Sequence, residues 1–294
     1  MARIFSVCLV AVMSCSCAQV GAQGKMFKQG KQVGRIQSKQ LDEISGIAVS
    51  RKNPGVFWVH NDSGGKAQIY AINVRGHLLS TFLVTGAKAR DWEDIAIGPG
   101  PQANQSYLYI ADIGDNKAKQ KTVTVYRVPE PMVSLTQPVS VDRTAKADAI
   151  KLKYPDRPRD AETLLVDPLT KDLYIISKRE LTNKVYRAPY PQSTEDTTTL
   201  QFKATLGTGL SVGGDISAHG RFVVVRSALG AVLFERVSGK PLWEAFKKTP
   251  RALPVKSEPQ GEAIAFDIEG RGYYTVSEGK KQPIYYYERI KAAD

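Results

Sequence analysis

Acidic residues recur at the start of short apolar segments, where their carboxylates could bind a metal ion or take part in acid–base chemistry. The five recurring acids are Glu43, Glu93, Glu162, Asp215 and Glu262. Each precedes a run of small or apolar residues, as in Ala263-Ile264-Ala265 after Glu262. Successive acids lie roughly fifty residues apart, with one longer interval after Glu93, which is the length of a propeller blade. The pattern predicts one acid in each structural repeat.

Carboxylates gathered around one axis need a counter-ion, because each negative charge raises the pKa of its neighbours. Ca²⁺ suits such a site, since it accepts about 6–8 oxygen ligands in irregular geometry. The three histidines are scattered, and the three cysteines all lie within the first 17 residues, which argues against zinc or copper. We therefore expect calcium or another hard divalent cation.

A second interpretation of these acids stays open. Single carboxylates can instead accept hydrogen bonds from backbone N–H groups or pair with Lys and Arg. Several of the recurring acids also have an acidic neighbour, so the sequence does not decide which member of each pair faces the axis. These neighbours are Asp42, Asp91, Asp94 and Asp160.

A second set of polar residues follows the next strand of each repeat. The candidate substrate-binding residues are Lys178, Arg179, Arg226, Asp112 and Asn116. Guanidinium and ammonium groups of this kind bind phosphate or carboxylate oxygens. His60 and Asp62 are candidates for acid–base catalysis, because an imidazole exchanges protons near neutral pH. The alternative is that these segments are ordinary turns, for which Asn, Asp, Ser and Gly are well suited.

Short strands must position all of these residues, since no long segment has helical periodicity. After each acidic segment comes a second strand, predicted over 56–60, 107–111, 173–177, 222–226 and 273–277. A third strand built around an aromatic residue follows at 68–70, 123–126, 184–186, 232–234 and 283–286. Weaker fourth strands are expected at 78–84, 149–153, 200–206 and 247–256.

These triplets predict an all-β chain that forms a single β-propeller of five blades. The first strand of a blade lines the central channel, so equivalent acids would point at one axis. A strand over 32–37 has no triplet of its own and is expected to complete the last blade and close the ring. The Pro-bounded stretch 130–138 is predicted to be an extended loop, and six blades remain the alternative if residues 130–155 contain a degenerate one.

The N-terminal segment has the pattern of an export signal. Arg3 precedes an apolar run that ends at Met13, which is too short for a transmembrane helix. We expect a signal peptide over 1–22, a tether over 23–31 and the propeller domain over 32–294. Cys15 is a candidate lipidation site in a lipobox-like sequence, and cleavage before Gln23 is the competing route. The expected location is therefore periplasmic, anchored to the outer membrane, or extracellular.

The charge of the chain favours anionic partners. Lys and Arg exceed Asp and Glu by 12, which attracts anionic small molecules or components of the cell envelope. The basic pairs lack interleaved aromatic residues, so nucleic acid is not an expected partner. No other segment approaches the roughly 18 consecutive apolar residues expected of a membrane span. We expect a monomer that has at most a lipid anchor.

Several blocks resemble those of a family of exported bacterial propeller proteins that mostly have no assigned function. The blocks are Trp58-Val59-His60-Asn61-Asp62-Ser63-Gly64, Asp91-Trp92-Glu93-Asp94, Asp112-Ile113-Gly114-Asp115-Asn116, Asp160-Ala161-Glu162-Thr163-Leu164 and Gln260-Gly261-Glu262-Ala263-Ile264. The architecture is more distantly similar to that of the calcium-activated nucleotidases (apyrases), whose axial calcium is held by side chains of the first strands. That resemblance implies the five recurring acids as calcium ligands.

Two functions follow from these expectations. The first is an exported propeller with a Ca²⁺-like axial site that acts as a binding protein of the envelope or the extracellular space. The alternative is a calcium-dependent hydrolase of an anionic substrate, such as a nucleotide, another phosphoester or a lactone. The sequence contains no clear pairing of a nucleophile with a base, so the two remain open at this point.

Overall fold

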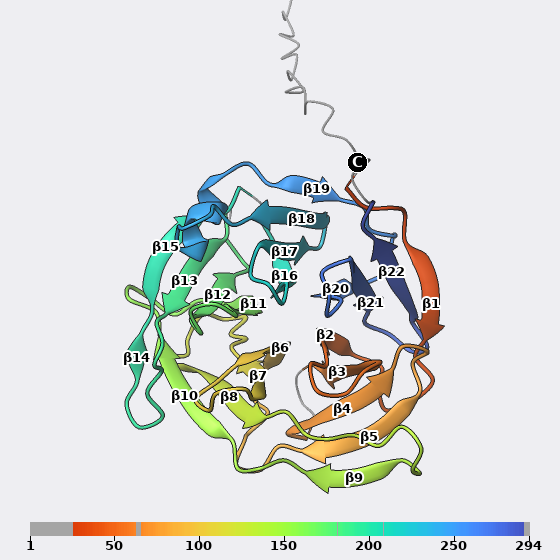
Figure 1. Ribbon diagram of the computed structural model, residues 1–294. Coiled ribbons are helices and arrows are strands. Elements are labelled where there is room, and N and C mark those ends of the chain that lie inside the picture. Colours follow the sequence, from red (N-terminus) through yellow and green to blue (C-terminus); the bar gives the residue numbers. More distant parts are fainter. Residues whose placement is uncertain (1–25, 63–65, 181, 208, 291–294) are drawn as a thin grey trace, which may run out of the picture.

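The computed structural model describes residues 26–62, 66–180, 182–207 and 209–290. Five sheets, built mainly of antiparallel strands, surround a central axis, and the first strand of each sheet lies nearest to it (Figure 1). This arrangement confirms the predicted all-β propeller of five blades. The predicted signal peptide, with Cys15, lies outside the described residues.

The first two blades each contain five strands. Blade 1 consists of β2 (Ile44–Val49), β3 (Val56–Asn61), β4 (Gln68–Asn73), β5 (Leu78–Leu83) and β9 (Ser140–Arg143). Blade 2 consists of β6 (Trp92–Pro99), β7 (Ser106–Asp112), β8 (Val123–Pro129), β10 (Asp148–Lys153) and β14 (Thr198–Thr199). In both blades the fifth strand is short and joins the outer edge in parallel orientation.

The remaining blades each contain four strands. Blade 3 consists of β11 (Ala161–Val166), β12 (Leu173–Ser177), β13 (Lys184–Ala188) and β15 (Gln201–Thr205). Blade 4 consists of β16 (Ser211–Ile216), β17 (Phe222–Ser227), β18 (Gly230–Glu235) and β19 (Arg251–Leu253), and a short 3₁₀ helix, η1 (Leu242–Lys247), precedes β19. Blade 5 consists of β20 (Gly261–Phe266), β21 (Gly272–Ser277), β22 (Pro283–Glu288) and β1 (Lys31–Arg35).

The N-terminal strand closes the ring as predicted. β1 pairs antiparallel with β22, so the first and last described strands share one blade (Figure 1). Contacts with the propeller begin before residue 32, because Phe27 pairs with Arg289 and is only 3% exposed. β1 thereby covers the edge of β22 that would otherwise be free.

The stretch after blade 2's third strand is an irregular connection, as predicted, but it leads into a strand that was not predicted. Residues 130–138 do form an irregular connection, but the chain then continues into β9, which pairs with β5 of blade 1. The connection therefore leads back to the preceding blade and adds a strand to its outer edge. The strands of the region 130–155 are β9 and β10, which belong to blades 1 and 2, so the six-blade alternative does not apply.

The hydrophobic core is divided among the five gaps between neighbouring blades. Each of the five core clusters combines side chains from two adjacent blades, as in the cluster of Tyr109 with Leu164 between blades 2 and 3. The innermost strands are the most buried, and every residue of β2, β11 and β16 is buried. A strand buried on both faces reads as a continuous run of small and apolar residues. This rigid core fixes the positions of the polar side chains at the ends of the inner strands.

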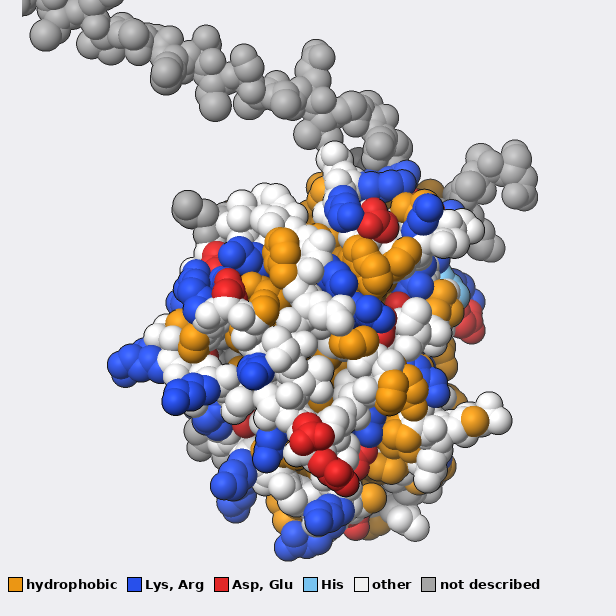
Figure 2. Space-filling view, turned by 90° about the vertical axis from the view of Figure 1, so that its left-hand side faces the viewer, with side chains coloured by type: hydrophobic (Ala, Val, Ile, Leu, Met, Phe, Trp, Pro, Cys, Tyr) orange, Lys and Arg blue, Asp and Glu red, His pale blue; other side chains and the backbone are white. Residues whose placement is uncertain are grey.

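Lys and Arg side chains are spread over the side of the molecule seen in Figure 2, with Asp and Glu side chains among them. In the described part of the chain, no helix has the length and apolar character needed to cross a bilayer.

Candidate metal centre

A bulge at the start of each innermost strand fixes which side chains reach the channel. In all five blades the pairing between the first and second strand skips one residue on the first strand. A bulge of this kind redirects the side chain of the extra residue. The five extra residues are Ser45, Glu93, Glu162, Val212 and Glu262. Three of the five predicted acids therefore occupy equivalent positions.

The other two predicted acids lie elsewhere, so the expected ring of five equivalent acids is wrong. Glu43 precedes β2 by one residue and its side chain is exposed, while Ser45 takes the bulge position. Asp215 lies three residues after the bulge residue Val212, deeper along β16. Its carboxylate accepts hydrogen bonds from the N–H groups of Ile216 at 2.8 Å and Phe266 at 2.9 Å. Asp215 thus fits the alternative interpretation, in which a carboxylate accepts hydrogen bonds from backbone N–H groups.

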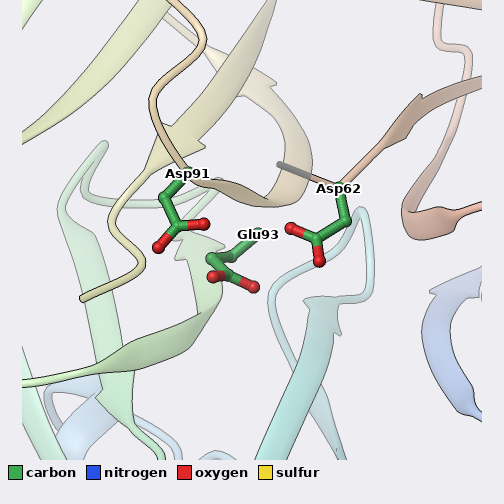
Figure 3. A group of neighbouring side chains, drawn as sticks. All are labelled: Asp62, Asp91 and Glu93. Carbon is green, nitrogen blue, oxygen red and sulfur yellow. The ribbon is translucent and has the colours of Figure 1, made fainter. Parts of the chain in front are cut away.

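Three carboxylates from different segments converge at the mouth of the channel. Asp62 follows β3, Asp91 precedes β6 and Glu93 is the bulge residue of β6. One carboxylate oxygen from each lies within 4.8 Å of the others, and the three side chains point toward one another (Figure 3). Oxygen atoms at this spacing suit a hard cation such as Ca²⁺ or Mg²⁺. We call Asp62, Asp91 and Glu93 the carboxylate triad.

Glu93 is the most buried member of the carboxylate triad. It is only 4% exposed, and within the described residues its carboxylate has no hydrogen-bond or ion-pair partner. Burial raises the pKa of Glu93 well above its usual value, and the charges of Glu162, Asp62 and Asp91 raise it further. Burial and the charge of Asp62 likewise raise the pKa of Asp91. A bound cation would remove both the repulsion and the desolvation cost.

A glycine allows the carboxylates to approach one another. A Cβ atom on Gly114 would lie 2.0 Å from Oε1 of Glu93 and 2.5 Å from Oδ2 of Asp91. The Gly114 N–H also donates to the carbonyl oxygen of Asp91 at 3.2 Å. The Asp-Ile-Gly-Asp-Asn block therefore packs directly against the carboxylate triad, and only glycine leaves room for two of its side chains.

Lys178 supplies a positive charge beside the acids on the other side of the mouth. It follows β12, and its ammonium donates to Oε2 of Glu162. Burial raises the pKa of Glu162 to about 7 although the Lys178 charge opposes this shift, and burial together with Glu278 raises the pKa of Glu262 to about 7. The Ser45 hydroxyl lies 3.2 Å from Oε2 of Glu262. Glu162 and Glu262 thus have polar partners that the carboxylate of Glu93 lacks.

The structure brings together most of the predicted substrate-binding residues at this mouth. Arg179 donates from Nε to Asp160 at 2.6 Å and also donates to the side chain of Asn116, while its side chain stays 52% exposed. Asp112 is buried, and its carboxylate accepts a hydrogen bond from the Asp91 N–H at 2.9 Å. Arg179 and Asn116 can therefore face a ligand, whereas Asp112 positions the loop that carries Asp91.

Two predicted residues are unsuited to the roles expected of them. His60 is fully buried, its Nδ1 lies 2.8 Å from the carbonyl oxygen of Asn61, and burial lowers its pKa to about 4. Such an imidazole stays neutral and does not reach solvent, so acid–base catalysis by His60 is not supported. Arg226 is 4% exposed and forms an ion pair with the buried Glu258, so its guanidinium belongs to the core of blades 4 and 5.

From the sequence it stays open whether Asp91 or Glu93 faces the axis, and no role is predicted for Gly114. Side chains alternate between the two faces of a strand, so residues two apart share a face. Asp91 precedes Glu93 by two residues, and this spacing was the available signal that both face the same way. For Gly114 the sequence offered only a turn-like context, since its contact with Asp91 and Glu93 depends on the packing of one loop on another. Asp62 was predicted as a candidate acid–base residue, and the structure places it with the carboxylate triad instead.

No protein-family model matches the chain, and no curated protein matches it either. The resemblance to exported bacterial propellers and to apyrases therefore rests on the propeller fold and on the sequence blocks alone.

Proposed function

We propose that the protein binds a hard divalent cation of the Ca²⁺ type at the channel mouth and uses it to hold an anionic ligand. The observation that carries this proposal is the buried carboxylate of Glu93, which has no partner of its own among the described residues and lies within 4.8 Å of carboxylate oxygens of Asp62 and Asp91. The three side chains would supply the protein ligands. Ca²⁺ accepts about 6–8 oxygens, so positions would remain for water or for ligand oxygens.

The surroundings of the carboxylate triad favour an anion as the second ligand. Arg179 is half exposed at the same mouth, and Asp160 and Asn116 fix two of its five N–H donors. The free donors of a guanidinium match phosphate or carboxylate oxygens. An oxyanion bound by both the cation and Arg179 would meet opposite charge on two sides. We infer the same envelope or extracellular setting that the N-terminal sequence predicts, with a small anion or an envelope component as the ligand.

Binding is favoured over hydrolysis by the positions of two residues. A divalent cation can also polarise a phosphoryl or acyl oxygen and orient water. The predicted general base His60 and the predicted anion ligand Arg226 are both buried, however, and contact neither the solvent nor the mouth. We therefore propose cation-dependent binding as the function.

Calorimetric titration of chelator-stripped protein with CaCl₂ tests the proposal. We expect a single saturable site in the wild type and at least an order of magnitude weaker binding in Glu93→Gln. Asp196→Asn is the matched control, because Asp196 is an exposed loop acid and its change to an amide leaves the mouth untouched. Equal calcium affinity in Glu93→Gln and the wild type would overturn the proposal.

A second titration tests the anionic ligand. Phosphate- and carboxylate-bearing small molecules are titrated into the calcium-loaded protein, with Arg179→Met as the variant. Binding that requires calcium and weakens in Arg179→Met supports the proposed site. Chelator-sensitive turnover of a nucleotide, a phosphomonoester or a lactone would instead establish hydrolysis.

A further inference from the structure

Lys178 is positioned above the channel by the strand that precedes it and by a backbone hydrogen bond. It follows Ser177, the last residue of β12, and its N–H donates to the carbonyl oxygen of Asp160 at 3.0 Å. Its ammonium group donates to Oε2 of Glu162, and the two side chains are 15% and 6% exposed. An ion pair this deep has little freedom to move into solvent. The ammonium is therefore a fixed charge at the mouth.

The charge of Lys178 acts on more than one acid. Burial lowers its pKa, but the attraction of Glu162, Glu262 and Glu93 outweighs burial and raises the pKa above its ordinary value. The ammonium thus stays protonated at neutral pH. Glu162 is its direct partner, and Glu262 is the next carboxylate that it stabilises.

Glu93, the buried member of the carboxylate triad, has no comparable cation among the described residues. Arg90 is adjacent to Asp91, but its guanidinium donates to the carbonyl oxygens of Gly114 at 2.6 Å and Asp112 at 3.2 Å. Glu93 is the one bulge acid whose carboxylate has no hydrogen-bond or ion-pair partner in the described part of the chain, and it is 4% exposed. We therefore divide the acids at the mouth into a half beside Lys178, made of Glu162 and Glu262, and a half around Glu93, whose carboxylate has no ion-pair partner in the described part of the chain.

We infer that Lys178 is the built-in counter-cation of the channel, which neutralises the Glu162–Glu262 half and confines the divalent cation to the carboxylate triad. This inference rests on the proposed function, and it places the ion to one side of the propeller axis. It also gives Lys178 a role in specificity: the chain binds one divalent ion because an ammonium group occupies the place of a second. Lys178 is thus a determinant of stoichiometry and not itself an anion ligand.

The inference is tested by the calcium stoichiometry of chelator-stripped protein, measured by calorimetry and by metal analysis after dialysis. Lys178→Met removes the charge and keeps most of the side-chain length. We expect the wild type to bind one calcium ion, Lys178→Met to bind two, and Lys178→Arg to bind one. Lys151→Met controls for the change in total charge, since Lys151 is exposed on β10, and it is expected to bind one.

The outcomes separate this inference from the proposed function. A wild type that binds no calcium contradicts both. A wild type that binds one ion together with a Lys178→Met variant that also binds one overturns only the inference, whatever the affinity. A wild type that binds two ions overturns the inference as well.

A double variant keeps the test informative if Lys178→Met does not fold, as judged by circular dichroism. Lys178→Met combined with Glu162→Gln removes both charges of the ion pair and restores the wild-type charge balance. It is expected to bind one calcium ion with an affinity within a few fold of the wild type. Loss of calcium binding in this double variant would overturn the division of the mouth into two halves.

Discussion

Gly114 is the residue that sets how closely the carboxylates of Glu93 and Asp91 approach. Gly114→Ala would place a methyl group 2.0 Å from Oε1 of Glu93, so the two carboxylates must separate. We expect calcium affinity to fall by about tenfold or more, because the oxygens leave the geometry that a cation needs. Calorimetry measures the affinity, and circular dichroism checks that the fold is kept.

Gly207→Ala is the matched control for this substitution. A Cβ atom on Gly207 meets no atom within 4 Å, so calcium affinity should stay that of the wild type. An unchanged affinity in Gly114→Ala would show that the carboxylate triad does not hold the cation.

Glu93 also links the metal site to stability. Its pKa is raised in the folded state, so the folded protein binds this proton more tightly than the unfolded chain does. Raising the pH above the ordinary glutamate range therefore destabilises the cation-free fold. In the presence of a chelator we expect the melting temperature of the wild type to fall, relative to Glu93→Gln, between about pH 5 and about pH 8.

Thermal unfolding of both proteins across this pH range, with chelator and with calcium, measures the effect. Calcium should reverse the order at the upper end of the range, because only the wild type gains stability from binding. Parallel pH profiles of the two proteins under both conditions would contradict the assigned role of Glu93.

The sequence aligned five acids as equivalent, and the bulge register supports this for three of them. Glu93, Glu162 and Glu262 do occupy equivalent positions, as predicted, because each precedes its apolar run by the same offset. Glu43 and Asp215 were aligned with them on residue type alone, whereas the bulge register places Ser45 and Val212 at those positions. The position of a bulge depends on pairing with a second strand, so a single acidic residue in the sequence does not reveal it.

At the scale of the elements, two buried aspartates join innermost strands of neighbouring blades. Asp94 of β6 accepts hydrogen bonds from its neighbour Ile95 at 2.8 Å and from Leu164 of β11 at 2.9 Å. Asp215 makes the same pair of contacts, with Ile216 and with Phe266 of β20. These carboxylates satisfy backbone N–H groups on strands that do not pair with each other in a sheet. They are structural clamps between blades.

Asp94→Asn tests the clamp between blades 2 and 3. The amide offers one acceptor and places its NH₂ group against a backbone N–H, so one buried donor loses its partner. We expect the free energy of unfolding to fall by about 1–3 kcal/mol, measured by urea denaturation with saturating calcium present. Asp196→Asn, in an exposed loop, should leave it unchanged. Equal stability of the two variants would mean that the Asp94 carboxylate does not clamp the blades.

Most of the strands could be predicted from the sequence, and the exceptions have a common cause. The inner three strands of each blade have apolar runs, aromatic residues and turn signals that recur with the blade period. β9 and β14 have no such pattern: they are four and two residues long and largely exposed, with Val141 of β9 at 71% exposure. Their pairing partners lie far away in sequence, so only the assembled ring shows that they are strands.

At the scale of the whole molecule, the ring depends on its N-terminal strand. A chain that begins at Ser38 lacks β1 and with it the buried side chains of Phe27 and Ile36, which are 3% and 0% exposed. Loss of a buried Phe or Ile costs about 2–5 kcal/mol each. We expect the melting temperature to fall by more than about 10 °C, because β22 also becomes a free edge.

A chain that begins at Met26 is the control for this truncation. It removes the predicted signal peptide and keeps Phe27, β1 and Ile36, so its melting temperature should equal that of the longer chain with the same ligands. Differential scanning calorimetry compares the two truncated proteins. A chain from Ser38 that melts with the control would show that β1 does not hold the ring closed.

The proposed cation site is tested most directly by crystal structures of the protein grown with calcium and, in parallel, with manganese for its anomalous signal. We expect one anomalous peak at the channel mouth, from a cation bonded to carboxylate oxygens of Asp62, Asp91 and Glu93 at roughly 2.1–2.6 Å. Lys178 should remain paired with Glu162 beside it. A channel mouth without a cation at saturating metal, or a cation bound between Glu162 and Glu262 on the propeller axis, would contradict the proposed site.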